Sequence, residues 1–334
     1  MSSPIHADLL AILDAVNVLS LSVYTIQGER REVSEPLREG VAPPRAKALE
    51  NDLYARLYMR PSAPEHVAAY DFLARRDFLA ALSAANSGRG TWEPGWTIRR
   101  VEDDGRVAVD KDGITFWAFP EGVRVSEGAA RPGVVCRVWV GKELRGLLPG
   151  FYLAIGDAEG DEEEAGGAHV RLYWHLTRAQ AVPFMERVTH ELNWAGTPFR
   201  VKVLSDPHAY HRADAGVLYL RRRDLDRIGD SIARIYQSVA TGLRPEVPMF
   251  TRRLAEGLGM ADDPAGGLSF GEHRCRLIAE ALWRSFVPGG PDGDRFATLA
   301  NAFRDAGLDP AFPHLGPGSR DDDRLAQALK AWRP

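Results

Sequence analysis

Cysteine is almost absent from this chain of 334 residues, which has only Cys136 and Cys275. Two cysteines cannot form a disulfide framework, and no CxxC spacing marks a thiol metal site or a redox motif. No apolar run approaches the roughly 18 residues that span a bilayer, and the first residues do not have the pattern of a signal peptide. We therefore expect a cytoplasmic protein in a reducing environment, with no membrane segment.

Several nucleotide, nucleophile and metal motifs are also missing. There is no GxxxxGK[ST] loop, no GxGxxG after a strand, no GxSxG and no HExxH. These absences argue against an ATPase, a dinucleotide enzyme, an α/β-hydrolase and a zinc protease. His169, His175 and His273 have no metal-ligand spacing, so we expect neither a metal nor a cofactor.

Basic residues do not outnumber acidic residues in this chain. The chain has 42 basic and 46 acidic residues and a formal net charge of −4, which argues against a nucleic-acid-binding protein. Only five of the basic residues are lysines: Lys47, Lys111, Lys142, Lys202 and Lys330. Arginine cannot serve as an amine base because it does not lose its proton at usable pH. Any chemistry that needs such a base therefore has few candidates.

The pattern of apolar residues predicts an α+β fold, with a mixed or antiparallel sheet between a helical N-terminal region and a helical C-terminal region. Residues 1–90 form the helical N-terminal region in this prediction, and residues 91–334 form an α+β domain. A stretch rich in Glu, Arg and Pro at 28–45 is predicted to be a loop. The hydrophobic content of 45% is enough for a sizeable core.

Short strands are predicted first near 96–100, 106–109, 114–119, 134–140 and 151–155. An acidic stretch then begins at Asp157 and is typical of a solvated loop, with a docking surface for a basic partner as the alternative. Further strands are predicted at 169–176, 199–204 and 216–221. Helices are predicted at 178–194, 224–239, 270–283, 293–306 and 320–332. Thr177 and Ser269 each precede a Gln or Glu by three residues, the spacing of a capping box.

Alternation along three of these strands separates apolar from cationic and aromatic side chains. Arg171, Tyr173 and His175 share one face of their strand. Arg200 and Lys202, and then Tyr219 and Arg221, do the same on the next two strands. A polar sheet face exposed to water is one interpretation. The absence of Asp and Glu at these positions favours an anion-binding face instead, because clustered like charges are costly without a counter-ion.

The segments beside these strands offer further candidates with open roles. Tyr210 is either a proton donor or a packed tyrosine, and Asp214 either orients an arginine or caps a turn. Arg274 lies in the first turns of the helix after Ser269, where it could bind an anion or simply lie on the surface.

Several runs together resemble the HopA-type effector family. The runs are Pro149-Gly-Phe-Tyr-Leu-Ala-Ile-Gly-Asp, Val170-Arg-Leu-Tyr-Trp-His-Leu, Pro198-Phe-Arg-Val-Lys-Val-Leu, Tyr210-His-Arg-Ala-Asp-Ala-Gly-Val-Leu-Tyr, Arg244-Pro-Glu-Val-Pro-Met-Phe-Thr and Ser269-Phe-Gly-Glu-His-Arg-Cys-Arg. The resemblance covers roughly residues 130–285. The family is named for bacterial type III effectors. It has members beside class V lanthipeptide and thioamitide genes, where they are taken to be phosphoserine and phosphothreonine lyases.

The resemblance implies a cofactor-free elimination of phosphate from a ribosomally made precursor peptide, which gives dehydroalanine or dehydrobutyrine. Lys202 matches the lysine of a family strand, and we expect it to be the base. Tyr210, and after it His175, are the candidate acids, although the position of His175 can be asparagine in the family. The candidate phosphate-binding residues are Arg171, Arg200, Arg212, Arg274 and Lys142, the last with a structural role as its alternative.

The expected partners are the phosphorylated precursor peptide and a separate Ser/Thr kinase, with a cyclase as a further candidate. The alternative function is a non-catalytic module that binds a precursor peptide or phosphopeptide, or a secreted effector that acts by binding. Lys202→Arg separates the two, because a binding site accepts arginine whereas an amine base does not.

Overall fold

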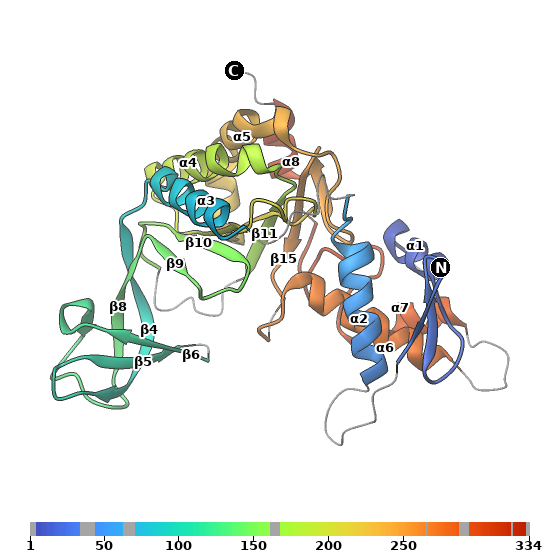
Figure 1. Ribbon diagram of the computed structural model, residues 1–334, viewed down its shortest axis with the longest axis horizontal. Helices are drawn as coiled ribbons and strands as arrows, with labels where there is room; N and C mark the ends of the chain where they lie inside the picture. The colour runs from blue at the N-terminus through green and yellow to red at the C-terminus, as the bar shows by residue number, and fades with distance from the viewer. Residues whose placement is uncertain are drawn as a thin grey trace.

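The computed structural model describes residues 5–33, 44–62, 71–111, 113–160, 168–264, 266–286, 294–321 and 323–331. These residues form helices around three antiparallel sheets, so the α+β prediction is confirmed. The body of the protein contains a seven-stranded sheet with helices on both sides, and a five-stranded sheet projects from it (Figure 1). None of the helices in the described ranges is long and apolar enough to cross a membrane.

The seven-stranded sheet has the strand order β14-β15-β11-β13-β12-β10-β9. Its strands are β9 (Glu143–Arg145), β10 (Phe151–Ile155), β11 (His169–Trp174), β12 (Arg200–Leu204), β13 (Gly216–Arg221), β14 (Arg252–Ala255) and β15 (Leu258–Asp262). The strands predicted at 151–155 and 216–221 have the observed bounds. The β14–β15 hairpin was not predicted, because all five residues of β15 are buried and no alternation marks them.

One face of this sheet carries the main hydrophobic core. Apolar residues of β11, β12 and β13 pack there against α4 (Arg178–Trp194) and α5 (Leu225–Val239). The helices α3 (Phe72–Ala85) and α8 (Arg324–Ala331) complete the layer, which lies at the top of Figure 1. Burying the apolar side of each strand leaves the cationic side facing the other way.

The other face is covered at its β11–β15 end by a second core. This core includes α6 (Phe270–Ser285), α7 (Arg295–Asp305), α1 (Ala7–Ala15) and the π-helix η1 (Leu53–Tyr58), which continues α2 (Pro44–Asp52). Tyr173 and Val217 are therefore buried beneath α6 and η1. Short 3₁₀ turns, η2 (Pro120–Gly122), η4 (Arg222–Asp224) and η5 (Ala240–Gly242), lie between the larger elements.

The N-terminal region is less helical than predicted. Residues 16–32 form a three-stranded sheet of β1 (Val16–Val18), β2 (Val23–Ile26) and β3 (Glu29–Glu32). The helix α1 ends at Ala15, and Val16 at its C-cap has extended backbone angles. Residues 34–43 of the predicted loop lie outside the described residues. The domain boundary at residue 90 stays a prediction, and Leu82 of α3 belongs to the same core as α4.

The projecting sheet has the order β6-β5-β4-β8-β7 and its own small core. Its strands are β4 (Gly90–Val101), β5 (Val107–Lys111), β6 (Ile114–Ala118), β7 (Val123–Val125) and β8 (Val135–Gly141). Buried Trp96, Val109 and Val138 fill one side of it. The long strands β4 and β8 connect this sheet to the body of the protein (Figure 1).

The two predicted capping boxes have different outcomes. At the start of α6, the Ser269 hydroxyl accepts the Glu272 amide and the Glu272 carboxylate accepts the Ser269 amide, so this box is confirmed. At the start of α4 the prediction is wrong. Thr177 occupies the N-cap position, but its hydroxyl donates to the carbonyl of Gly242, and no side chain caps the helix.

Candidate functional site

The register of the sheet places the cationic side chains of neighbouring strands side by side. Tyr219 of β13 lies between Arg171 of β11 and Arg200 of β12, and Val217 lies between Tyr173 and Lys202. The neighbouring strand β10 adds Leu153 opposite Lys202. The predicted cationic face therefore exists, because the three strands that carry it are adjacent.

Lys202 is half-buried and lies over aromatic rings. Its Nζ is 4.4 Å from the centroid of Phe151 and 5.7 Å from that of Tyr219. Among the described residues it has neither a hydrogen bond nor an ion pair. Aromatic faces attract a cation only weakly compared with a carboxylate, so this amine remains available to a ligand.

Three of the other lysines have partners. Lys47 forms an ion pair with Glu50, and Lys111 forms one with Glu93. Lys142 donates to the backbone carbonyls of Ser83 and Asn86, each at 2.9 Å. These contacts fit the structural role that was considered as the alternative for Lys142, since its amine holds the end of α3. Its hydrogen-bond partners, Ser83 and Asn86, include none of the arginines predicted to bind phosphate.

Arg212 lies beside Lys202, on the segment between β12 and β13. Its Nε and Nη2 donate to the two oxygens of Asp214 at 2.5 and 2.6 Å. The guanidinium is 5.9 Å from the Phe151 ring, so Lys202 and Arg212 contact the same aromatic side chain. Asp214 orients an arginine, which is one of the two roles considered for it.

Tyr54 of η1 completes this cluster. Its hydroxyl donates to Asp214 at 3.2 Å and accepts from Arg212 Nη2 at 3.3 Å. Burial raises the pKa of Tyr54 well above its ordinary value, and the Asp214 carboxylate raises it further. The phenol thus remains protonated and donates to the carboxylate that holds the arginine.

Arg171 has a matching arrangement on the other side of Tyr219. Its Nε donates to Asp263 at 2.8 Å, and its guanidinium is 5.1 Å from the Tyr219 ring. Nη2 also contacts Asp263, at 2.5 Å. Among the described residues, Nη1 of Arg171 and Nη1 of Arg212 have no hydrogen-bond partner. Each arginine is thus held by a carboxylate and keeps one donor nitrogen.

Glu272 connects the start of α6 to the same region. Burial alone would raise the pKa of its carboxyl, but the hydrogen bonds from Ser269 and the positive charges of Lys47 and Lys202 lower it below the ordinary value. The carboxylate is therefore ionised. We call the group of Lys202, Phe151, Tyr219, Arg212, Asp214, Tyr54, Arg171 and Asp263 the Lys202 site.

Two arginines predicted for phosphate binding lie outside the Lys202 site. Arg200 is exposed and donates to Glu93 of β4 at 2.5 Å. Arg274 is fully buried and donates to the carbonyls of Pro313 and Leu315, each at 2.8 Å. Burial lowers the pKa of Arg274 to about 10. Its hydrogen bonds hold the chain after α7 against α6, which is a structural role.

The two candidate proton donors are buried. Tyr210 packs edge to face on Phe78 and donates to the carbonyl of Leu204 at 2.7 Å. Burial raises its pKa well above the ordinary value, so it fits the alternative of a packed tyrosine. His175 is also buried, its Nδ1 is 3.0 Å from the carbonyl of Glu246, and burial lowers its pKa. A neutral imidazole at this place has little capacity to donate a proton.

Tyr54 and Asp263 were not identified from the sequence. Tyr54 lies 160 positions before Asp214, in the N-terminal region for which only helical structure was predicted. Asp263 directly follows the unpredicted strand β15. A search for acidic residues able to orient the candidate arginines would have found Asp214 but not Asp263. Across the described ranges, no three His, Cys, Asp or Glu side chains form a metal-binding group.

The fold and site together define an α+β protein whose antiparallel sheet carries aromatic residues, arginines and one lysine on the same face. Residues 145–315, more than half of the chain, match the model of the HopA1 effector protein family. The chain belongs to this family, and the predicted resemblance to HopA-type effectors is confirmed.

Two solved structures are similar to the chain. One is the effector protein from Pseudomonas syringae pv. tomato strain DC3000, which is 18% identical and has a TM-score of 0.49 over 81% of this chain and 94% of that one. The other is the effector protein from Pseudomonas syringae pv. syringae strain 61, 15% identical, with a TM-score of 0.44 over 80% of this chain and 88% of that one. Among curated proteins, none matches the chain.

Proposed function

We propose that this protein is a lyase that removes phosphate from phosphoserine or phosphothreonine in a ribosomally made precursor peptide. The observation that carries the proposal is the half-buried amine of Lys202, which has no anionic partner among the described residues and lies beside an arginine held by a carboxylate. A base next to a phosphate-binding group is what a β-elimination needs.

The proposed reaction is balanced without a cofactor. After losing its own proton, the amine of Lys202 takes the α-proton of the substrate, and the electron pair of the C–H bond forms the Cα–Cβ double bond. The Cβ–O bond breaks, and the phosphate leaves with its electron pair. An ester that binds as its monoanion releases hydrogen phosphate, so neither Tyr210 nor His175 has to supply a proton. The lysine then returns its proton to water.

The arginines of the Lys202 site would bind the phosphate. Asp214 occupies Nε and Nη2 of Arg212, and Asp263 does the same for Arg171, which leaves Nη1 of each guanidinium for an oxygen of the ester. Charge-assisted hydrogen bonds of this kind are short and about twice as strong as neutral ones. Tyr219, whose ring contacts both Arg171 and Lys202, would offer a hydroxyl to the developing negative charge on the substrate carbonyl.

A separate kinase must phosphorylate the peptide before this reaction, and a cyclase could consume the dehydrated product. The main alternative is a module that binds the phosphopeptide without reacting with it, since the same arginines serve both functions. The two functions differ in their need for an amine.

The test compares wild-type protein with Lys202→Arg on a phosphothreonine peptide, with binding measured by calorimetry and loss of phosphoric acid by mass spectrometry. We expect the variant to bind the peptide and to eliminate no phosphate. Lys330→Arg on the exposed face of α8 is the matched control and should retain full turnover. Full turnover by Lys202→Arg would refute the base. A wild type that leaves phosphopeptides unchanged would leave binding as the function.

A further inference from the structure

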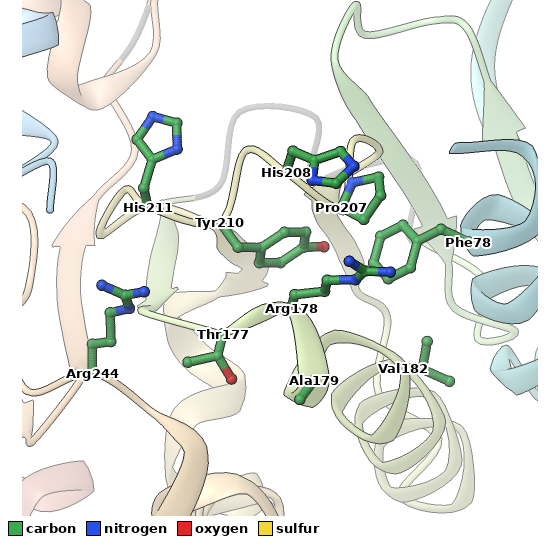
Figure 2. A pocket seen from close by; sticks show the side chains of 10 residues that line it. All are labelled: Phe78, Thr177, Arg178, Ala179, Val182, Pro207, His208, Tyr210, His211 and Arg244. Atoms are coloured by element: carbon green, nitrogen blue, oxygen red, sulfur yellow. The ribbon is translucent and has the colours of Figure 1, made fainter. Parts of the chain in front are cut away.

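The structure contains a cavity that is lined by none of the residues of the Lys202 site. It has a volume of about 820 Å³ and is formed between the start of α4, the segment after β12 and the helix α3. A cavity of this size accommodates several side chains of a peptide. Figure 2 shows Arg178, His208 and Phe78 at one end of it and His211 and Arg244 at the other.

The lining combines apolar surface with positive or potentially positive groups. Phe78, Val182 and Tyr210 provide the apolar part, while Arg178 and Arg244 provide the charge. Among the described residues, no acidic side chain lines the cavity. A ligand that complements it must therefore have both apolar groups and negative charge.

Arg178 is the most informative of these residues because of its place in the helix. It is the first residue of α4, where the helix dipole makes a positive charge unfavourable. The first turn of α4 contains no acidic residue, and Thr177 does not cap the helix with its side chain. Among the described residues, Arg178 has no ion-pair partner. An anionic group in the cavity would satisfy both the arginine and the helix start.

His211 lies at the end of the lining opposite Arg178 (Figure 2). Its Nδ1 is buried and has no hydrogen-bond partner among the described residues. Because this atom has almost no exposed surface, only the rest of the imidazole contributes to the cavity wall. Arg244 is already held in part, because its Nη1 donates to the Ser62 hydroxyl at 2.5 Å.

The cavity and the Lys202 site share one stretch of chain. Tyr210 and His211 line the cavity, and Arg212 and Asp214, one and three positions after His211, form the Lys202 site. Tyr210 packs on the α3 and α4 side of the sheet, and Arg212 contacts Tyr54 on the other side, so a peptide that occupies both places would pass around this stretch of chain. Its acidic side chains would face Arg178 and Arg244, and its apolar side chains would face Phe78 and Val182.

We infer that this cavity binds an acidic, apolar-rich segment of the peptide substrate outside its phosphorylated residue. The inference rests on the proposed function for the identity of the occupant. It assigns substrate recognition to the start of α4, at a distance from the reacting atoms.

The test measures binding directly, so that it does not depend on turnover. A fluorescein-labelled peptide of alternating leucine and glutamate is titrated with the full chain, and fluorescence anisotropy gives the Kd. We expect micromolar binding to the wild type and an increase in Kd of at least about tenfold for Arg178→Glu, because the charge contact becomes repulsive. A peptide with lysine in place of glutamate should not bind.

Three comparisons keep the result specific. A glutamate in the first turn interacts favourably with the helix dipole and stabilises α4. Weaker binding by Arg178→Glu therefore cannot be ascribed to unfolding of this helix. Arg178→Lys preserves the charge and should keep the Kd within about threefold. Arg76→Glu makes the same change of charge on the exposed face of α3, outside the cavity, and should leave the Kd unchanged.

Two results would overturn the inference: no binding of the acidic peptide by wild type, or equal weakening by Arg178→Glu and Arg76→Glu. The elimination assay with Lys202→Arg decides the reaction separately. A protein that binds the acidic peptide through Arg178 but eliminates no phosphate would retain this recognition site and lose the proposed chemistry.

Discussion

Lys202 and Arg212 contact the same phenyl ring. The Phe151 centroid lies 4.4 Å from the lysine Nζ and 5.9 Å from the arginine guanidinium, so one aromatic side chain sets the spacing of two cations that have no bond to each other. Like charges repel each other, and contact with the ring offsets part of that repulsion. A bound anion would offset more of it.

Removing the ring should separate the two cations. We expect Phe151→Leu to lower the rate of phosphate elimination by about tenfold, because a cation–π contact of about 1 kcal/mol or more is lost and the lysine is less well positioned. Mass spectrometry of the phosphothreonine peptide measures the rate. Phe116→Leu in the projecting sheet removes a comparable half-buried ring and is the control. Equal rates for both variants would contradict a role for the ring.

Asp214 should matter through the arginine that it holds. In Asp214→Asn the neutral amide cannot accept both Nε and Nη2 of Arg212, so the guanidinium loses its fixed orientation. We expect KM for the phosphopeptide to rise by about tenfold or more. Tyr54→Phe removes a single hydrogen bond to the same carboxylate, and its effect should be smaller. A larger effect of Tyr54→Phe would show that the phenol itself contacts substrate.

Arg274 should affect stability and leave the phosphopeptide KM unchanged. Arg274→Met leaves the carbonyls of Pro313 and Leu315 without their donors, at a cost of about 2–4 kcal/mol in the free energy of unfolding. Urea denaturation followed by circular dichroism measures this cost. Arg276→Met, exposed on the same helix and paired only with Glu280, should change stability by less than about 0.5 kcal/mol. A raised KM with normal stability would return Arg274 to the phosphate-binding group.

His175 should make the protein sensitive to mild acid. Burial lowers its pKa below the ordinary 6.5, so the unfolded chain binds a proton more readily than the folded one. Its contribution to stability is complete above about pH 6.5 and is lost as the pH falls below that value. His175→Asn removes this contribution, so the stability difference between wild type and variant should shrink between pH 7.5 and pH 5. A constant difference would show that the imidazole takes up its proton equally in both states.

Much of the sheet could be predicted because its strands alternate. The alternation of Val201 and Val203 with Arg200 and Lys202 showed both the buried side and the cationic side of β12 before any neighbour was known. The strand β15 could not be found in this way, because both of its sides are buried. The main core, which includes α4 and α5, covers one side, and the second core, which includes α6, covers the other. Asp263, which follows β15 and holds Arg171, was missed for the same reason.

The parts of the site that the sequence left open depend on long-range contacts. The sequence alone does not distinguish the role of Arg274 from that of Arg212, because the difference lies in their surroundings. Arg274 donates to a backbone carbonyl of a distant loop, whereas Arg212 donates to a carboxylate two residues away. Periodicity reports which face a residue occupies, but not which distant segment packs on that face.

The position of Tyr54 has a consequence for the newly made chain. The tyrosine leaves the ribosome early, but its ring stacks on Tyr58, which packs in turn on Phe250 and Phe270 in the last third of the sequence. The cluster of Tyr54, Arg212 and Asp214 therefore forms only after α6 has emerged. Copies still in synthesis therefore lack the complete Lys202 site until most of the chain has been made.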